Sequence, residues 1–125
     1  MDENDIGRLI VDASLKVHTA LGAGLLESVY ETCLAHELEK QGLAVRKQVA
    51  LPIVYDDLRV DNAFRIDLLV DDKVVVELKA IDNLLPVHTA QLLSYLKLGK
   101  YKLGFLLNFN VVHMKDGIRR LVNGL

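Results

Sequence analysis

Several features that would define other protein classes are scarce or missing in this 125-residue chain. A single cysteine, Cys33, excludes an internal disulfide and is typical of the reducing cytoplasm, where we expect the protein to be. No apolar run approaches the roughly 20 residues of a membrane-spanning helix, so no membrane contact is expected. The acidic residues 1–5 predict no secretory signal peptide. Without repeats or low-complexity segments, the chain is expected to form one domain over residues 1–125.

Neither sign of charge dominates the sequence. Fifteen basic and 17 acidic residues give a net charge of −2 and a pI near 6.0, which counts against a dedicated high-affinity nucleic-acid binder. A nuclease is not excluded, because metal ions neutralise carboxylates and local basic clusters can meet a phosphate backbone. Hydrophobic residues make up 51% of the chain and mean hydropathy is +0.24, high values for a small monomer. A buried interface would absorb this excess, so we expect a homodimer.

Two short polar motifs stand inside apolar runs. Arg65-Ile66-Asp67 is followed, ten residues after the aspartate, by Glu77-Leu78-Lys79. Mg²⁺, for which Mn²⁺ can substitute, takes oxygen ligands and usually receives one or two carboxylates, which Asp67 and Glu77 supply. Lys79 shares a strand face with Glu77 and can stabilise charge that develops on an attacked phosphodiester. The motifs predict a Mg²⁺-dependent phosphodiesterase; the alternative is an exposed ion pair across two strands.

The spacing of the motifs decides whether the two carboxylates can meet. Two β-prone runs flank the polar residues 71–73, a pattern that predicts a hairpin. With a three-residue loop, Val70 pairs with Val74 and Asp67 lies opposite Glu77, where Cβ atoms come within roughly 5 Å. A two-residue loop would instead send the carboxylates to opposite faces of the sheet and remove the metal site.

The hydrophobic pattern also predicts the order of the elements. Apolar residues at helical spacing, together with a first-turn proline for the third helix, predict helices over residues 5–21, 25–41 and 86–99. β-Prone runs predict strands over residues 44–55, 58–70, 73–81 and 101–108, and a short further strand around 111–114. This order predicts an α/β sandwich with a mixed sheet and the acidic hairpin at its centre.

The second helix has two polar residues on or near its apolar side. Glu27 aligns with Leu34 and Leu38 on the helical wheel, which predicts that it packs inward, although an exposed first-turn acid is the commoner arrangement. Tyr30 lies at the edge of the same stripe, where a half-buried core tyrosine is expected.

The third helix has His88, Gln91 and Tyr95 on one face. Gln91 is placed to orient a nucleophilic or metal-bound water. Tyr95 can stack on a base or pack against the protein, and for both Tyr95 and His88 the structural role is favoured.

Five segments of the chain match the motifs of a known protein family, in the same order. They are Gly24-Leu25-Leu26-Glu27-Ser28-Val29-Tyr30, Asp67, Val76-Glu77-Leu78-Lys79-Ala80, His88-Thr89-Ala90-Gln91 and Gly104-Phe105-Leu106-Leu107-Asn108-Phe109-Asn110. From about residue 5 to residue 123 the chain thus resembles the GxxExxY protein family, which is placed in the PD-(D/E)XK nuclease superfamily.

The resemblance implies a restriction-endonuclease-like αβββαβ core, in which helices flank a central mixed four-stranded sheet, with an extra N-terminal helix. It implies Glu27, Asp67 and Glu77 as metal ligands and adds Lys79 and Gln91 to the catalytic set. Ile66 stands where many members of the superfamily have a proline before the aspartate.

Three functions remain open from the sequence. The leading hypothesis is a Mg²⁺-dependent nuclease that hydrolyses DNA, with RNA the less favoured substrate. The second is a catalytically silent nucleic-acid-binding or protein-interaction module that keeps the nuclease fold. A weaker third is a metal-dependent hydrolase of a small phosphate ester.

Overall fold

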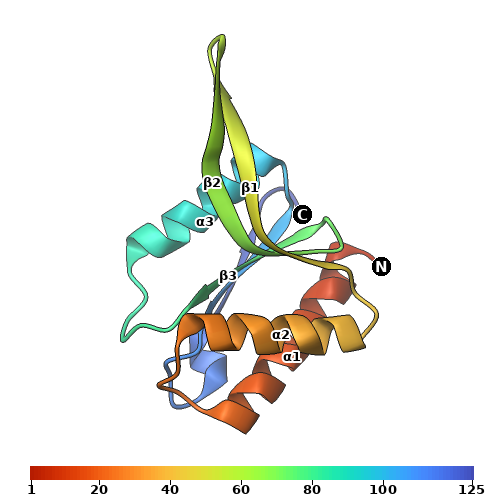
Figure 1. The fold of residues 1–125 in the computed structure, drawn as a ribbon, viewed down its shortest axis with the longest axis vertical. Coiled ribbons are helices and arrows are strands. Elements are labelled where there is room, and N and C mark those ends of the chain that lie inside the picture. The colour runs from red at the N-terminus through yellow and green to blue at the C-terminus, as the bar shows by residue number, and fades with distance from the viewer.

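The computed structural model describes residues 1–125 as a mixed sheet with helices on both faces (Figure 1). In chain order the elements are α1 (Glu3–Leu21), α2 (Glu27–Lys40), β1 (Val45–Tyr55), β2 (Leu58–Val70), β3 (Val74–Lys79), α3 (Pro86–Gly99), β4 (Leu103–Asn108), the 3₁₀ turn η1 (Met114–Gly117) and β5 (Ile118–Val122). The strands are ordered β1-β2-β3-β4-β5, with β3 and β4 parallel and the other neighbours antiparallel. The predicted α/β architecture with a central acidic hairpin is confirmed, and β5 adds a fifth strand to the expected four.

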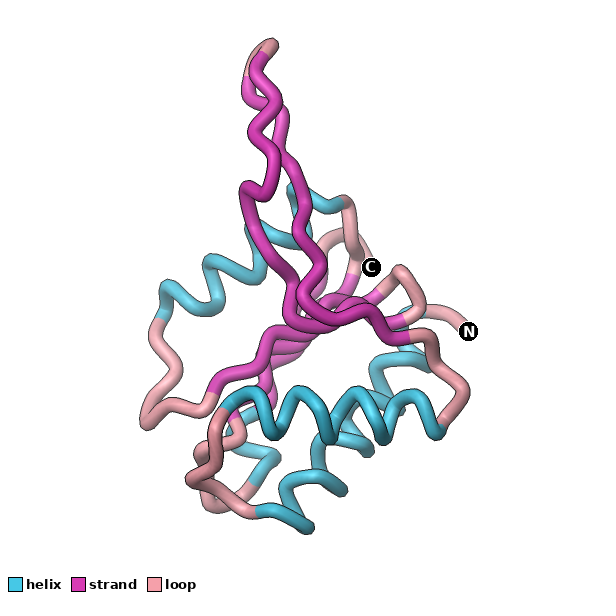
Figure 2. The backbone as a smooth tube through the Cα atoms, viewed as in Figure 1, coloured by secondary structure: helices cyan, strands magenta, loops and turns pink.

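Helices cover both faces of the sheet (Figure 2). A hydrophobic core on each face holds them in place. Side chains of β3 alternate between the two cores: Val74, Val76 and Leu78 pack with α1 and α2, and Val75 packs with α3. Because successive strand residues point to opposite faces, Glu77 shares the α3 side with Val75. None of the helices combines the length and apolar character that crossing a bilayer requires.

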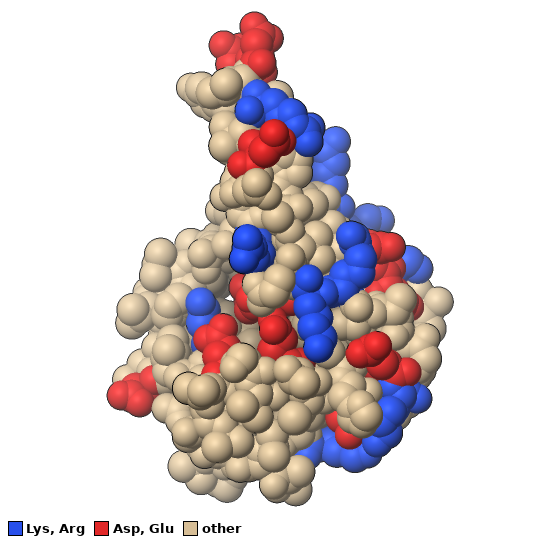
Figure 3. Space-filling view, in the orientation of Figure 1, with Lys and Arg blue, Asp and Glu red and all other residues tan.

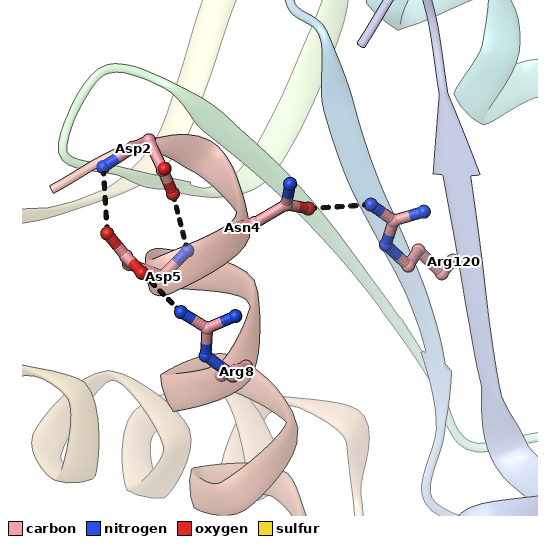
Figure 4. A network of polar contacts seen from close by, with 5 residues as sticks. All are labelled: Asp2, Asn4, Asp5, Arg8 and Arg120. Carbon is pink, nitrogen blue, oxygen red and sulfur yellow. Dashed lines mark hydrogen bonds and ion pairs between the residues drawn. The ribbon is translucent and has the colours of Figure 1, made fainter.

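Polar contacts fix the start of α1 (Figure 4). Asp2 and Asp5 form a capping box, in which each carboxylate accepts the backbone N–H of the other residue. Asn4 Oδ1 accepts a hydrogen bond from the Arg120 guanidinium of β5 at 2.8 Å, and Arg8 pairs with Asp5. The first helix is therefore tied to the edge strand of the sheet.

The C-terminal segment differs from the sequence prediction. Residues 111–114 were expected as a strand, but 111–113 form a loop and Met114 begins η1. Phe109, directly after β4, is completely buried and stacks on Tyr30 with ring centroids 4.6 Å apart, so the chain does not turn back at that point to pair with β4. The chain reverses its direction only at the 3₁₀ turn η1. There it passes so close to β4 that a Cβ on Gly117 would lie 2.0 Å from Asn108 O. Strand pairing therefore begins only after the turn.

The strands β1 and β2 continue beyond the sheet as a two-stranded arm (Figures 1 and 2). The pair bends where it leaves the sheet, because Val45 packs against the core of α1 and α2 whereas Val49 packs against the core of α3. Gln48 lies between them with a left-handed backbone, φ 53°. The register places Asp67 of β2 opposite Gln48, so that Asp67 stands at this bend.

Candidate active site

The β2–β3 hairpin has the register that brings the two carboxylates together. Its backbone pairs run from Val70↔Val74 to Leu68↔Val76, and the loop between the strands has three residues. The next pair in this register is Asp67 and Glu77, where the backbone ladder stops. Asp67 N–H donates to Glu77 Oε1 at 3.1 Å, and Leu78 N–H donates to Asp67 Oδ2 at 2.9 Å. The loop therefore has the three residues that the metal-site hypothesis requires. Where the strands part, hydrogen bonds from backbone N–H groups to the two carboxylates take the place of backbone pairing.

Glu77 lies in an environment that disfavours its charged form. It is 6% exposed. Burial, and after it the neighbouring charge of Asp67, raise the pKa of Glu77 to about 9, against the opposing effect of the Lys79 ammonium. Neither Asp67 nor Glu77 takes part in an ion pair. The site therefore concentrates two acidic groups without a protein cation bound directly to either.

Lys79 ends β3 two residues after Glu77. It is half-buried and forms no ion pair, while its positive charge opposes the rise in the pKa of both Glu77 and Glu27. The chain around it is fixed from β4. Phe109 N–H donates to Lys79 O at 2.9 Å, and the buried Asn108 side chain bonds both the N–H and the C=O of Ile81. A rigid main chain therefore presents the lysine beside the acidic pair.

Glu27 is the first residue of α2 and is exposed, so the prediction that it packs inward is wrong. The helical wheel extends the inward stripe of Leu34 and Leu38 to the helix end, but residues 27–29 of α2 are exposed and the buried stripe begins only at Tyr30. Glu27 nevertheless faces the site: partial burial and then the charge of Asp67 raise the pKa of Glu27, and Lys79 opposes them. Its carboxylate therefore belongs to the rim of the acidic region.

Tyr30 has the structural role that the sequence favours. It is completely buried; its hydroxyl donates to Gly22 O at 2.6 Å and accepts from Leu25 N–H at 3.1 Å. These bonds fix the loop between α1 and α2. The tyrosine thereby sets where α2 begins and, with it, the position of Glu27.

Glu31 and Gln48 are site residues that the sequence analysis missed. Together with Glu27 and Ser28 they line an open hollow of about 240 Å³. Figure 3 shows acidic side chains gathered in a recess between the base of the arm and α2, with basic side chains on its margins. Burial, and less strongly the charge of Asp67, raise the pKa of Glu31, while its hydrogen bond from Gln48 opposes that rise. Glu31 lies four residues after Glu27, one helical turn, and that spacing was the available signal.

The side chains of α3 contribute less directly to the site than those of β2 and β3. Tyr95 stacks on Phe64 with ring centroids 4.7 Å apart, and burial followed by the charges of Glu77 and Asp67 raises the pKa of its hydroxyl. Its packing role is confirmed, and its phenol also lies within the field of the acidic pair. His88 Nδ1 accepts Leu85 N–H at 2.9 Å at the start of α3, a structural role as predicted. Gln91 is exposed, and no hydrogen bond joins it to either carboxylate.

The arrangement can offer oxygen ligands to a hard cation. Asp67 and Glu77 are brought together, whereas Glu27 and Glu31 stand at the rim, and no three His, Cys, Asp or Glu side chains converge on one point. A pair of carboxylates is what Mg²⁺ commonly takes from a protein, because it keeps several waters. That Glu27, Asp67 and Glu77 together bind a metal ion stays a prediction.

Comparison with known proteins agrees with this geometry. A family model described as the PD-(D/E)XK nuclease superfamily matches residues 4–121, and the narrower GxxExxY assignment stays a prediction. No curated protein and no solved structure matches the chain. The matched region includes both strands of the acidic hairpin, the helices on either side and β4. The chain belongs to the PD-(D/E)XK nuclease superfamily.

Proposed function

We propose that the protein is a Mg²⁺-dependent nuclease that hydrolyses phosphodiester bonds of DNA. The observation that carries the proposal is the pair of the half-buried Asp67 and the buried Glu77 where the strands part, with Lys79 beside it, in a chain of a nuclease superfamily. Two adjacent carboxylates without a paired cation are costly to bury in a purely structural role. A divalent cation bound between the two carboxylates would offset this cost, which is why the pair favours a metal site.

The donor set of the pair fits Mg²⁺. Asp67 Oδ2 and Glu77 Oε1 each accept a backbone N–H. Asp67 Oδ1 accepts a hydrogen bond from Gln48 Nε2 at 3.3 Å and keeps a second lone pair for a cation, and no hydrogen bond engages Glu77 Oε2. Carboxylate oxygens are the ligands that Mg²⁺ prefers. Asp67 and Glu77 would hold the ion, with Glu27 as the third ligand.

Each residue then has a defined task. When bound, Mg²⁺ supplies Lewis-acid activation of the phosphate and of a water nucleophile. The Lys79 ammonium stabilises the negative charge that develops on the phosphoryl oxygens. Gln91, from α3, orients the attacking water. The backbone hydrogen bonds to Asp67 and Glu77 keep both carboxylates in place, so little reorganisation is needed during the reaction.

The test is cleavage of plasmid and oligonucleotide DNA with Mg²⁺ or Mn²⁺ by the parent, Glu77→Gln, Lys79→Ala and Lys73→Ala. We expect the first two variants to lower kcat by at least about 100-fold, the usual cost of removing a group that stabilises the transition state. Lys73 lies in the turn of the same hairpin and its ammonium bonds Met1 O, away from the acidic pair, so Lys73→Ala controls for the loss of a lysine. Full activity of Glu77→Gln and Lys79→Ala would exclude the mechanism.

The same assay separates the nuclease from a catalytically silent module. DNA binding without cleavage, unchanged by Asp67→Asn and by EDTA, would replace the nuclease proposal with the binding-module alternative. Cleavage of RNA oligonucleotides but not of DNA would correct the substrate while keeping the metal site.

A further inference from the structure

Gln48 has a backbone conformation that its residue type rarely adopts. Its φ is 53°, inside β1, at the bend where the arm leaves the sheet. Most other non-glycine residues with positive φ lie at turns or at a helix end; Asn62, in the irregular part of β2, is the second case inside a strand. Asn tolerates this region better than Gln does. Strained backbone of this kind is concentrated at functional sites.

The side chain of Gln48 joins two acidic residues from different elements. Its Nε2 donates to Glu31 Oε1 of α2 at 2.7 Å and to Asp67 Oδ1 of β2 at 3.3 Å. An amide nitrogen has two hydrogens, one for each carboxylate. The opposite amide orientation would aim the carbonyl oxygen at two carboxylates, so the chemistry of the partners fixes which way the amide points.

The second oxygen of Asp67 is held separately. Leu78 N–H donates to Oδ2 at 2.9 Å, while Gln48 reaches Oδ1. Both oxygens of this carboxylate are therefore restrained, one from β3 and one from β1. Glu31 in turn holds the amide through the shorter of its two bonds, so α2 is part of the same restraint.

We propose that Gln48 is a positioning residue, whose amide, clamped by Glu31, fixes the orientation in which Asp67 presents its carboxylate to a divalent cation. The proposal rests on the proposed nuclease function for its consequence in catalysis. Its structural part, the restraint on Asp67, stands on the hydrogen bonds alone. Partners that orient a ligand carboxylate typically change metal affinity or activity about 10–100-fold when they are removed.

The variant that isolates the amide is Gln48→Gly, because glycine adopts the left-handed backbone without strain. Asn62→Gly is the matched control: it relieves the same backbone conformation on the same arm, away from the acidic pair. If Gln48 served only the backbone bend, the two variants would behave alike. We expect both to keep the melting temperature of the parent or to raise it.

Two measurements test the proposal: amide hydrogen exchange of the metal-free protein and calorimetric titration with Mn²⁺. In Gln48→Gly, the Leu78 amide that bonds Asp67 should exchange its hydrogen about tenfold faster, since its acceptor is no longer fixed. The calorimetric dissociation constant for Mn²⁺ should rise about 10–100-fold. Asn62→Gly should match the parent in both.

These readouts do not depend on cleavage. A parent that binds Mn²⁺ but cuts no DNA would refute the nuclease proposal while leaving the role of Gln48 measurable. A parent that binds no Mn²⁺ would refute the metal part of both. Parent-like Leu78 exchange in folded Gln48→Gly, or equal changes in the two glycine variants, would overturn the assignment of Gln48.

Discussion

At the scale of single residues, the burial of Glu77 is the most consequential feature. The residue is 6% exposed, and its carboxyl receives a hydrogen bond from the Asp67 backbone and faces the Asp67 carboxylate. Desolvation and like charge both favour the protonated form. The metal-free protein should therefore be destabilised by ionisation of the residue that the proposed function needs ionised.

This conflict predicts a pH dependence of stability. Native Glu77, with its pKa near 9, retains its proton over a range where the unfolded residue, with a pKa of 4.5, has lost it. Because the native state then binds more protons, the free energy of unfolding falls as pH rises from about 4.5 to about 9. Glu77→Gln has no proton to lose, so it should be more stable than the parent at pH 8, by an amount on the order of a few kcal/mol.

Urea unfolding of the parent and Glu77→Gln at several pH values in EDTA measures the difference. The control is Glu39→Gln, because the Glu39 side chain is exposed and makes no hydrogen bond or ion pair; its profile should run parallel to that of the parent. Divalent cations should reduce the advantage of Glu77→Gln, since they stabilise the ionised parent. Parallel profiles for the parent and Glu77→Gln would show that Glu77 ionises normally.

The residues of the site were predictable to different degrees. Asp67 and Glu77 could be paired from the sequence, because a two-residue strand period and a three-residue polar loop fix a hairpin register. Gln48 could not, since its left-handed backbone is imposed by the bend of a long strand pair and not by its own preference. The exposure of Glu27 was missed because a helical wheel does not reveal where the core ends along the helix.

At the scale of elements, the segment after β3 is held by hydrogen bonds from the side chain of Asn108, the last residue of β4, to the backbone of Ile81. Asn108 is 2% exposed; its Oδ1 accepts the N–H of Ile81 and of Asn110, and its Nδ2 donates to Ile81 O at 2.9 Å. This segment directly follows Lys79. Asn123 makes comparable side-chain hydrogen bonds to the backbone at the other end of the sheet, where its Nδ2 donates to Leu96 O and Tyr101 O.

The two asparagines allow stability to be separated from function. Asn108→Ala leaves buried backbone groups without partners and should cost about 1–3 kcal/mol. It should also lower kcat by roughly tenfold, because Lys79 loses its fixed main chain. Asn123→Ala should lose stability with little change in kcat. Urea unfolding and single-turnover cleavage at a temperature where both variants are folded provide the comparison; an equal loss of kcat in both would assign the effect to stability alone.

The elements themselves followed the sequence closely where apolar periodicity was strong. The meander β1–β2–β3, the helix from Pro86 and strand β4 lie within a few residues of their predicted positions. The tail was the exception. Its strand forms only after η1, because the buried Phe109 and the close passage of Gly117 past Asn108 delay the reversal, and neither packing constraint is visible in a local pattern.

At the scale of the whole molecule, charge is distributed unevenly around a small net value. The net charge is −2, yet acidic side chains are gathered in the recess and basic ones flank it (Figure 3). Lys47, beside Gln48, and Arg65, two residues before Asp67, form no ion pair, whereas Arg59 on the distal arm pairs with Asp61. The homodimer expected from the apolar composition stays a prediction, and Val54 and Tyr55 on the exposed arm are part of the apolar surface that it would cover.

These unpaired cations should set the salt dependence of DNA binding. Each phosphate that a cation neutralises contributes about 0.9 to the slope of log K against log salt for duplex DNA. Lys47→Ala and Arg65→Ala should each reduce the magnitude of the slope by about that amount. Arg59→Ala should leave it unchanged, because its guanidinium is already paired and lies away from the recess. Fluorescence anisotropy with a labelled duplex, in the Glu77→Gln background to prevent cleavage, measures the slope. If Arg59→Ala reduced it as much as Arg65→Ala, the DNA would follow the distal arm and not the margin of the acidic site.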